Sequence, residues 1–292
     1  MSLSKLNTAG LSAVNLWKSL IDGLTNYVGD SATFVILVLG VSKLISAYNA
    51  YLFEFAHQMG WWQQYRIQQD RMVDPKTTRE ALEGRYGLKS YIGLILVGVP
   101  ITYAQYFIYK KAYGFDVKTL PGSFSQFSWD LFKCIFAWDT SLFWIHYTLH
   151  YFPWLYKNIH KRHHEFKTVN VAVGGHLTFI DNLLMTFAPI IIGVTTSKST
   201  FLGLFVFQAF FTHIASRAHC GYELPWDPLN WVFPYCAYHD FHHLKTHYNF
   251  QTLFVFWDLI VGGNAQGCGT CIVGNQQTPR RIFCRRGTRP TG

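Results

Sequence analysis

Three short segments of the chain carry eight histidines at spacings that suit metal binding. Box 1 is His146-Tyr-Thr-Leu-His150, box 2 is His160-Lys-Arg-His163-His164, and box 3 is His239-Asp-Phe-His242-His243. Residues three or four apart lie on one face of a helix, and imidazole is the commonest metal-ligating side chain. We therefore expect helical boxes that bring their imidazoles into one pocket.

The number of histidines favours two metal ions over one, because eight imidazoles exceed what an ion with four to six ligands accepts. A pair of histidines four residues apart is common on helix surfaces and in cores, but three boxes, two with identical spacing, are not. The HExxH zinc proteases place a glutamate between their histidines, and these boxes have none. Imidazole suits zinc, copper, iron and nickel, so the spacing alone predicts two transition metals without identifying them.

The composition indicates a membrane protein. Only 14% of the residues are charged and 50% are apolar, whereas about 25% of the residues in a soluble domain are charged. A helix needs about 20 apolar residues to cross a bilayer. We predict an all-α integral membrane bundle of about four to five spans, with a cytosolic helical domain that carries the boxes. The candidate spans are residues 33–53, 90–110, 128–148, 179–195 and 199–216.

The distribution of charge predicts the sidedness of the boxes. Residues 54–89 are rich in lysine and arginine and are therefore expected to be cytosolic. Five crossings would then put all three boxes on the cytosolic side. We divide the chain into a weakly amphipathic N-terminal segment (1–32), a membrane domain that contains the three boxes (33–263) and a basic, flexible tail (264–292). The tail holds a lone CxxC at residues 268–271, which is too few ligands for a structural zinc site.

Beyond the boxes, further short segments match a known family. The chain resembles the fatty acid hydroxylase/sterol desaturase superfamily of membrane di-iron enzymes over about residues 50–263, and most of all the C-4 methylsterol oxidases. Residues 152–156 also look like those of sterol side-chain hydroxylases. The matching segments are YRIQ at 65–68, IHKRHHEF at 159–166, AHCGY at 218–222 with PW at 225–226, NF at 249–250 and WD at 257–258.

The resemblance implies a cofactor, its ligands and its setting. It implies two Fe ions, with electrons from NAD(P)H through cytochrome b5 and its reductase or a similar donor, in a multi-pass endoplasmic reticulum protein whose boxes face the cytosol. The eight box histidines become iron ligands, with His219 as a further ligand and His176 as a weaker candidate. No catalytic residue is expected beyond the metal site. Because outer groups orient metal-bound imidazoles, we expect such roles for Asp139, Glu165, Asp240, Asn249 and Asp258, although Asp240 faces away from the box 3 histidines and could be solvated.

The predicted function is O2-dependent oxidation of a membrane lipid, most of all the C-4 methyl group of a sterol in sterol biosynthesis. Alternatives within the superfamily are hydroxylation or desaturation of a sterol side chain, a sphingoid base or a fatty acyl chain. A histidine-rich metal transporter or metal-binding protein is an alternative from another class, but it would carry ligands along a path inside its spans. A sterol-binding protein with an inactive site would lack a ligand, and all eight are present. No nucleic-acid partner is expected.

Overall fold

The computed structural model describes residues 8–68, 75–86, 92–231, 233 and 235–262. Within these residues the fold is helical, and pairing of extended backbone is limited to one isolated bridge between Arg66 and Tyr222. The chain divides into two compact units. Unit 1 takes in residues up to Tyr48, Glu83–Leu142 and Phe179–Ile214, and unit 2 takes in Asn49–Leu82, Phe143–Thr178 and Ala215 onward. The tail at 264–292, with its CxxC, lies outside the described residues.

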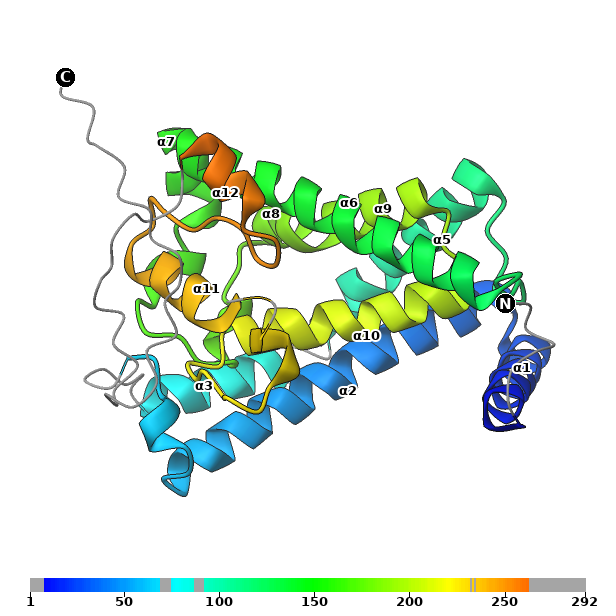
Figure 1. Cartoon of the computed structure of the whole chain (residues 1–292), viewed down its shortest axis with the longest axis horizontal. Coiled ribbons are helices and arrows are strands. Elements are labelled where there is room, and N and C mark those ends of the chain that lie inside the picture. Colours follow the sequence, from blue (N-terminus) through cyan, green and yellow to red (C-terminus); the bar gives the residue numbers. More distant parts are fainter. Residues whose placement is uncertain (1–7, 69–74, 87–91, 232, 234, 263–292) are drawn as a thin grey trace. The chain divides into compact units, whose positions relative to one another are not determined.

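Unit 1 consists mainly of long helices (Figure 1). Three of them, α2, α6 and α10, continue along the chain into unit 2. The helices of this unit are α1 (Thr8–Val28), α2 (Asp30–Gln58), η3 (Leu94–Gly98), α5 (Val99–Tyr113), α6 (Phe124–Tyr151), α8 (Phe179–Asn182), η7 (Leu183–Phe187), α9 (Ala188–Ser197) and α10 (Phe201–Ala218).

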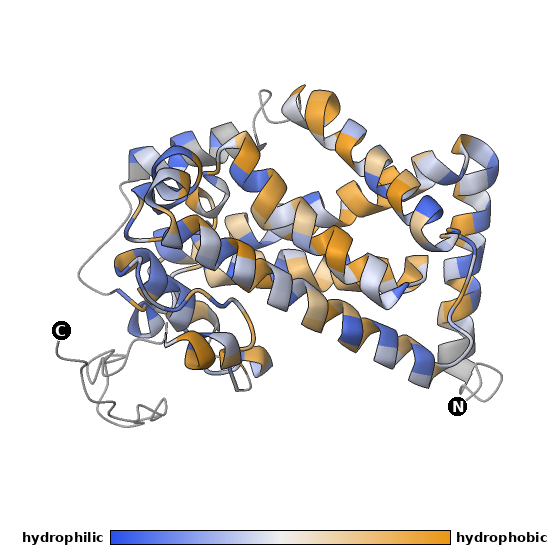
Figure 2. Cartoon of the chain, turned by 90° about the horizontal axis from the view of Figure 1, so that it is seen from above, coloured by the Kyte–Doolittle hydropathy of each residue, from blue (hydrophilic) through white to orange (hydrophobic). Residues whose placement is uncertain are grey.

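The described residues contain three helical stretches that are long and apolar enough to cross a membrane. They are α2, the continuous run from α8 to α9 (Phe179–Ser197), and α10; the first two contain the predicted spans 33–53 and 179–195, and α10 overlaps the predicted span 199–216. From Leu94 onward the predicted span 90–110 lies on η3–α5, and the span 128–148 lies on α6; neither of these stretches is among the three. Figure 2 shows that many residues along the long helices are hydrophobic (orange). The predicted all-α membrane fold is confirmed, while the number of crossings and their sidedness stay predictions.

An aromatic cluster joins the helices of unit 1 at one end. The ring of Phe34 on α2 lies 5.6 Å from those of Tyr106 on α5, Phe115 after α5, and Phe201 at the start of α10. The Phe34–Phe115 pair is edge-to-face and the other two are tilted, and edge-to-face ring pairs add stability beyond the burial of the rings. The cluster therefore fixes the start of α2, the end of α5 and the start of α10 at one level.

Unit 2 is built from short and irregular elements around the ends of α2, α6 and α10. Box 1 lies on α6 and box 3 on α11, as predicted for helical boxes, whereas box 2 is not on an α-helix. His160 ends a π-helical turn, and His163 and His164 begin a separate 3₁₀ turn. The elements are η2 (Gln63–Tyr65), α3 (Pro75–Tyr86), α7 (Pro153–Leu155), η4 (Tyr156–His160), η5 (His163–Glu165), η6 (Val173–Gly175), η8 (Pro228–Trp231), α11 (Tyr235–Leu244) and α12 (Phe256–Val261).

We expect Gly193→Ala to destabilise unit 1, because α9 and α6 touch at this glycine. A Cβ at Gly193 would lie 2.8 Å from the carbonyl oxygen of Cys134 and 3.0 Å from Cβ of Trp138. The Cys134 carbonyl is part of the backbone and cannot change rotamer, so α6 and α9 must move apart. Overpacking of this kind costs about 1–3 kcal/mol, which a lowered midpoint of thermal unfolding of the detergent-solubilised protein would report.

The matched control is Gly203→Ala on α10, where a Cβ would meet only ordinary contacts at 3.6 Å or more. Alanine favours a helix over glycine by about 1 kcal/mol, so this variant should unfold at the same temperature or higher. Equal midpoints for the two variants would contradict the close approach of α6 and α9.

Candidate metal centre

Nine buried or half-buried histidines of unit 2 form two groups, each of which could hold a metal ion. Group A is His146, His150, His160, His164 and His242, and group B is His163, His219, His239 and His243. Within each group the nearest ring nitrogens all lie within 4.8 Å of one another. All eight box histidines and His219 are therefore brought together, as the boxes predicted, although they form two groups instead of a single ring of ligands.

The groups draw their members from every box. Box 1 contributes both histidines to group A, because the rings of His146 and His150 share one face of α6 with centroids 4.9 Å apart. Boxes 2 and 3 are divided between the groups, and His219 joins group B from the residue that follows α10. The groups adjoin, since the ring of His164 in group A lies 4.7 Å from that of His243 in group B.

The Nε2 atoms face one another at distances that suit a shared cation. In group A, Nε2 of His164 lies 3.1 Å from Nε2 of both His150 and His160. In group B, Nε2 of His219 lies 3.0 Å from that of His239 and 3.3 Å from that of His243. Metal–nitrogen bonds of about 2.1 Å place neighbouring ligands about 3.0–3.4 Å apart in octahedral or tetrahedral geometry.

Backbone carbonyls orient three of the imidazoles. Nδ1 of His146 donates to the carbonyl of Phe250 (2.7 Å), and Nδ1 of His242 donates to that of Tyr248 (2.6 Å). Nδ1 of His219 donates to the carbonyl of Ala215, one turn earlier (2.9 Å). A carbonyl can only accept, so these rings carry their proton on Nδ1 and turn an Nε2 lone pair into the groups. Nε2 of His146 and of His242 is buried without a protein partner.

Burial also keeps the imidazoles uncharged, as metal ligands must be. Desolvation is the largest cause that lowers the pKa in every case, followed for most of them by repulsion from neighbouring histidines. The residues whose pKa is lowered well below 6.5 are His160, His163, His164, His239, His242 and His243. Neutral rings whose Nε2 lone pairs converge repel one another, and a bound cation removes that repulsion. The donor set therefore fits two neighbouring transition metal ions.

Asp258 supports group A indirectly, through the loop that faces it. The carboxylate is fully buried and accepts hydrogen bonds from the backbone N–H of Phe250 (3.1 Å) and Gln251 (2.8 Å) and from the hydroxyl of Tyr238 on α11 (3.0 Å). Desolvation raises its pKa to about 6. Asn249 begins this loop in a left-handed conformation (φ 61°). Together these contacts fix the carbonyls that orient His146 and His242.

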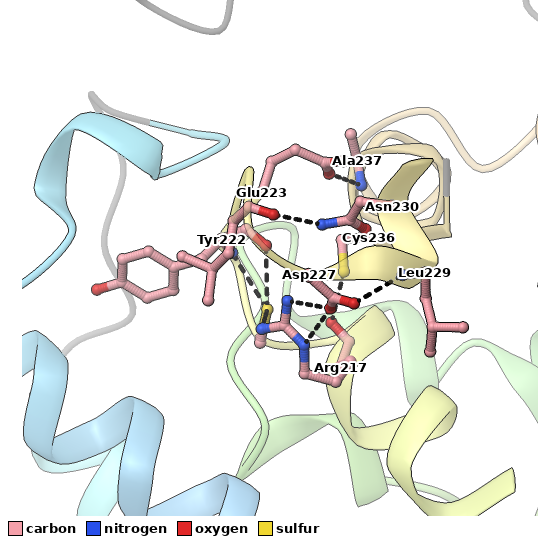
Figure 3. A network of polar contacts seen from close by, with 10 residues as sticks. Arg217, Tyr222, Glu223, Asp227, Leu229, Asn230, Cys236 and Ala237 are labelled. Atoms are coloured by element: carbon pink, nitrogen blue, oxygen red, sulfur yellow. Dashed lines mark hydrogen bonds and ion pairs between the residues drawn. The ribbon is translucent and has the colours of Figure 1, made fainter. Parts of the chain in front are cut away.

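A network around Arg217 holds the segment of His219 against the start of α11 (Figure 3). The guanidinium is 3% exposed and pairs with the carboxylate of Asp227 at 2.8 Å. It also donates to the sulfur of Cys220 (3.2 Å), and the thiol of Cys236 donates to the Arg217 carbonyl (3.3 Å). Cys220 follows His219 directly, and Cys236 lies one turn before His239. The network therefore sets the spacing of two group B histidines.

Glu165 and Asp240 have hydrogen-bond partners outside groups A and B. Nε2 of His176 contacts the carboxylate of Glu165 at 2.8 Å, outside both groups. Asp240 accepts from the amide of Gln68 at 2.6 Å and is 2% exposed, so the solvated position considered for it is wrong. Asp139 is buried on α6, two turns before His146.

Sequence reasoning missed the carbonyl partners, and it missed Gly174. A carbonyl is present at every residue and gives no signal of its own. Gly174 on η6 lies so close to His219 that a Cβ there would be 2.6 Å from its Cγ. A glycine beside a metal ligand is a signal only when the fold that brings the two together is known.

Comparison with known proteins finds a family match for part of the chain. Residues 131–263, somewhat less than half of the chain, match the fatty acid hydroxylase family model, and this domain match confirms the predicted resemblance. The match includes all nine histidines of the two groups. No solved structure matches the chain.

Three curated relatives illustrate the range of the similarity. Cholesterol 25-hydroxylase of Mus musculus is 30% identical over 134 residues, 44% of each chain, so the match spans less than half the length of that protein. Methylsterol monooxygenase 2-2 of Arabidopsis thaliana is 26% identical over 72% of this chain and 77% of its own. A very-long-chain aldehyde decarbonylase of Oryza sativa is 26% identical over 84% and 90%.

We expect Gly174→Ala to weaken metal binding at group B, because the added methyl displaces the ring of His219. The measurement is the amount of Co²⁺ bound by purified protein across a titration, with the visible absorption of the ion as the readout. The Gly203→Ala variant, far along the chain in unit 1, controls for a general loss of protein. Unchanged Co²⁺ binding by Gly174→Ala would contradict the placement of His219 in the group.

We expect Asp258→Asn to lower metal affinity by about 10–100-fold, the usual cost of losing an outer partner of a ligand. The amide keeps the shape but presents an N–H₂ group where three donors converge, so the loop that carries the Phe250 carbonyl must shift. Glu165→Gln is the matched control, since Glu165 touches only His176 outside the groups. Equal affinities for the two variants would show that Asp258 does not support group A.

Proposed function

We propose that the chain is an O2-dependent oxidoreductase that oxidises a membrane lipid with two iron ions held by groups A and B. The observation that carries the proposal is the pair of adjoining groups of uncharged imidazoles, inside a fatty acid hydroxylase domain. Two groups of histidines suit two ions, one in each group. The family is iron-dependent. The proposed ligands are the eight box histidines and His219.

The bound iron would supply the activation of O2 that oxidation of an unactivated C–H bond needs. The chain's own residues would hold and shield that centre. The imidazoles would hold the ions, and the carbonyls of Phe250 and Tyr248 fix the ring orientations of His146 and His242. The ring of Phe250 lies 5.3 Å from that of His150 and 5.5 Å from that of His242, so it keeps water away from one side of group A.

For the substrate we propose the C-4 methyl group of a sterol. The similarity to a plant methylsterol monooxygenase over most of both chains supports it, and so do the apolar helices, which give a lipid-soluble substrate access from the bilayer. The similarity to a cholesterol 25-hydroxylase and to a very-long-chain aldehyde decarbonylase keeps a sterol side chain and a long acyl chain as alternatives.

The electron supply and the location complete the proposal. We propose that electrons come from NAD(P)H through cytochrome b5 and its reductase or a similar donor, and that the protein lies in the endoplasmic reticulum membrane with the boxes facing the cytosol. The cluster of basic residues in segment 54–89 supports only the sidedness, because basic segments favour the cytosolic side. The electron donor and the endoplasmic reticulum follow from the resemblance to the superfamily.

The experiment is oxygen-dependent turnover by the iron-loaded protein in detergent, with a chemical or protein reductant and mass analysis of the products. The substrates are a 4,4-dimethylsterol, cholesterol and a very-long-chain aldehyde. We expect oxidation of the 4-methyl group. Oxidation of another of these lipids would support the oxidase activity and change the proposed substrate to that lipid. No O2 consumption with any of them would contradict the proposal.

Variants of single histidines connect that activity to the two groups. We expect His242→Ala in group A and His163→Ala in group B each to reduce turnover to background, because each removes a ligand from a different ion. His176→Ala is the matched control and should retain most of the activity, because His176 contacts Glu165 instead. Activity that survives loss of His163 would show that group B is not part of the reaction centre.

A further inference from the structure

Helix α1 has two apolar faces, and only one of them is covered by protein. Its covered face packs on the start of α10, where the ring of Trp17 lies 5.6 Å from that of Phe201 and 5.1 Å from that of Phe205. Ile21 on the same face is 2% exposed. This contact fixes α1 to unit 1, so the helix is an ordered part of the fold.

The uncovered face is an apolar stripe of three side chains. Leu16, Leu20 and Tyr27 are 72%, 44% and 89% exposed. With about 100° of rotation per residue, the three fall within about 40° of one another, and Lys18 falls on the opposite side of the helix. A helix with a covered face, an exposed apolar stripe and a separate polar side needs an apolar environment along that stripe alone.

The position of α1 in unit 1 shows what that environment is. A single residue, Gly29 with φ 84°, separates α1 from α2, the first helix able to cross a membrane. A left-handed glycine allows a sharp corner there. α1 also contacts the first turns of α10, a second such helix. Within unit 1, α1 runs across the long helices at the end where these two begin (Figures 1 and 2).

Basic side chains gather at the same end of unit 1. Nζ of Lys118 lies 3.8 Å from the carboxylate of Asp22 on α1. Lys110 and Lys111 close α5, and the hydroxyl of Tyr113 ties that end to the turn that contains Lys198 by donating to the carbonyl of Ser199 (2.9 Å). Cations beside aromatic rings are typical of the headgroup level of a bilayer.

We propose that α1 is an interfacial helix, whose stripe of Leu16, Leu20 and Tyr27 inserts into the boundary between the headgroups and acyl chains of a phospholipid bilayer. Such helices lie in the plane of the interface with the apolar side about 5–10 Å deep. A second copy of the chain fits less well, because three side chains cover little of the roughly 800 Å² per partner that a stable interface buries. The proposal does not rest on the enzymatic activity.

The test places a polarity-sensitive fluorophore on single cysteines in the full chain, reconstituted into phosphatidylcholine vesicles. The variants are Leu16→Cys and Tyr27→Cys on the stripe and Lys18→Cys as the matched control, each with Cys268, Cys271 and Cys284 changed to serine. The cysteines at 134, 220 and 236 are buried. We expect blue-shifted emission, quenched by a lipid with a nitroxide near its headgroup, at both stripe positions, and water-like emission quenched by iodide at Lys18→Cys.

Two outcomes would overturn the proposal. Water-like emission at all three positions would show that the stripe faces solvent. Blue-shifted emission that the nitroxide lipid does not quench would show that protein covers the stripe, and that a second copy or another chain is the occupant. Because all three positions are exposed, the substitutions remove no core contact and should leave folding unchanged.

Discussion

The structure of unit 2 depends on the burial of nine imidazoles whose lone pairs converge. Removing polar nitrogens from water without a partner costs free energy, and Nε2 of His146 and of His242 is buried without a protein partner. A bound cation turns that cost into a gain, because the metal accepts the lone pairs that otherwise repel. The metal ions would then cross-link α6, the turns of box 2, the end of α10 and α11, segments that together extend from His146 to His243. Metal binding and folding of unit 2 should therefore be strongly coupled.

This dependence explains why buried polar contacts hold together the elements around the imidazoles. Short elements cannot stabilise one another through long apolar faces, so buried polar groups hold them. The carboxylate of Asp258 gathers two backbone N–H groups and the Tyr238 hydroxyl, and the Arg217–Asp227 pair closes the loop after His219. Each of these charges is satisfied at its site, and each fixes a carbonyl or a turn that positions a ligand.

The sequence predicted the long helices and the convergence of the box histidines. It predicted less well the local backbone of box 2 and the hydrogen-bond partners of the rings. Apolar stretches and box spacing are strong local signals, and the structure contains both the long apolar helices and the converging histidines. The prediction of an α-helix for box 2 was wrong, because a π-helical turn ends at His160 and a separate 3₁₀ turn begins at His163. Adjacent residues on an α-helix point about 100° apart, and α11 divides His242 and His243 between the groups without such a break. The partners of the rings come from distant segments, such as Phe250 for His146, and no local pattern records them. The N-terminal segment was predicted to be only weakly amphipathic, yet α1 has a clear polar side, with Lys18, Asp22 and Asn26 within about 80° of one another and away from the exposed apolar stripe.

The most direct test of this account is the iron content and Mössbauer spectrum of the purified chain loaded with ⁵⁷Fe under anaerobic conditions. We predict about two irons per chain, in two environments with nitrogen ligands, since groups A and B differ in the number of histidines. One iron per chain, or iron displaced by zinc in a single tetrahedral site, would contradict the two-metal centre and with it the proposed oxidase.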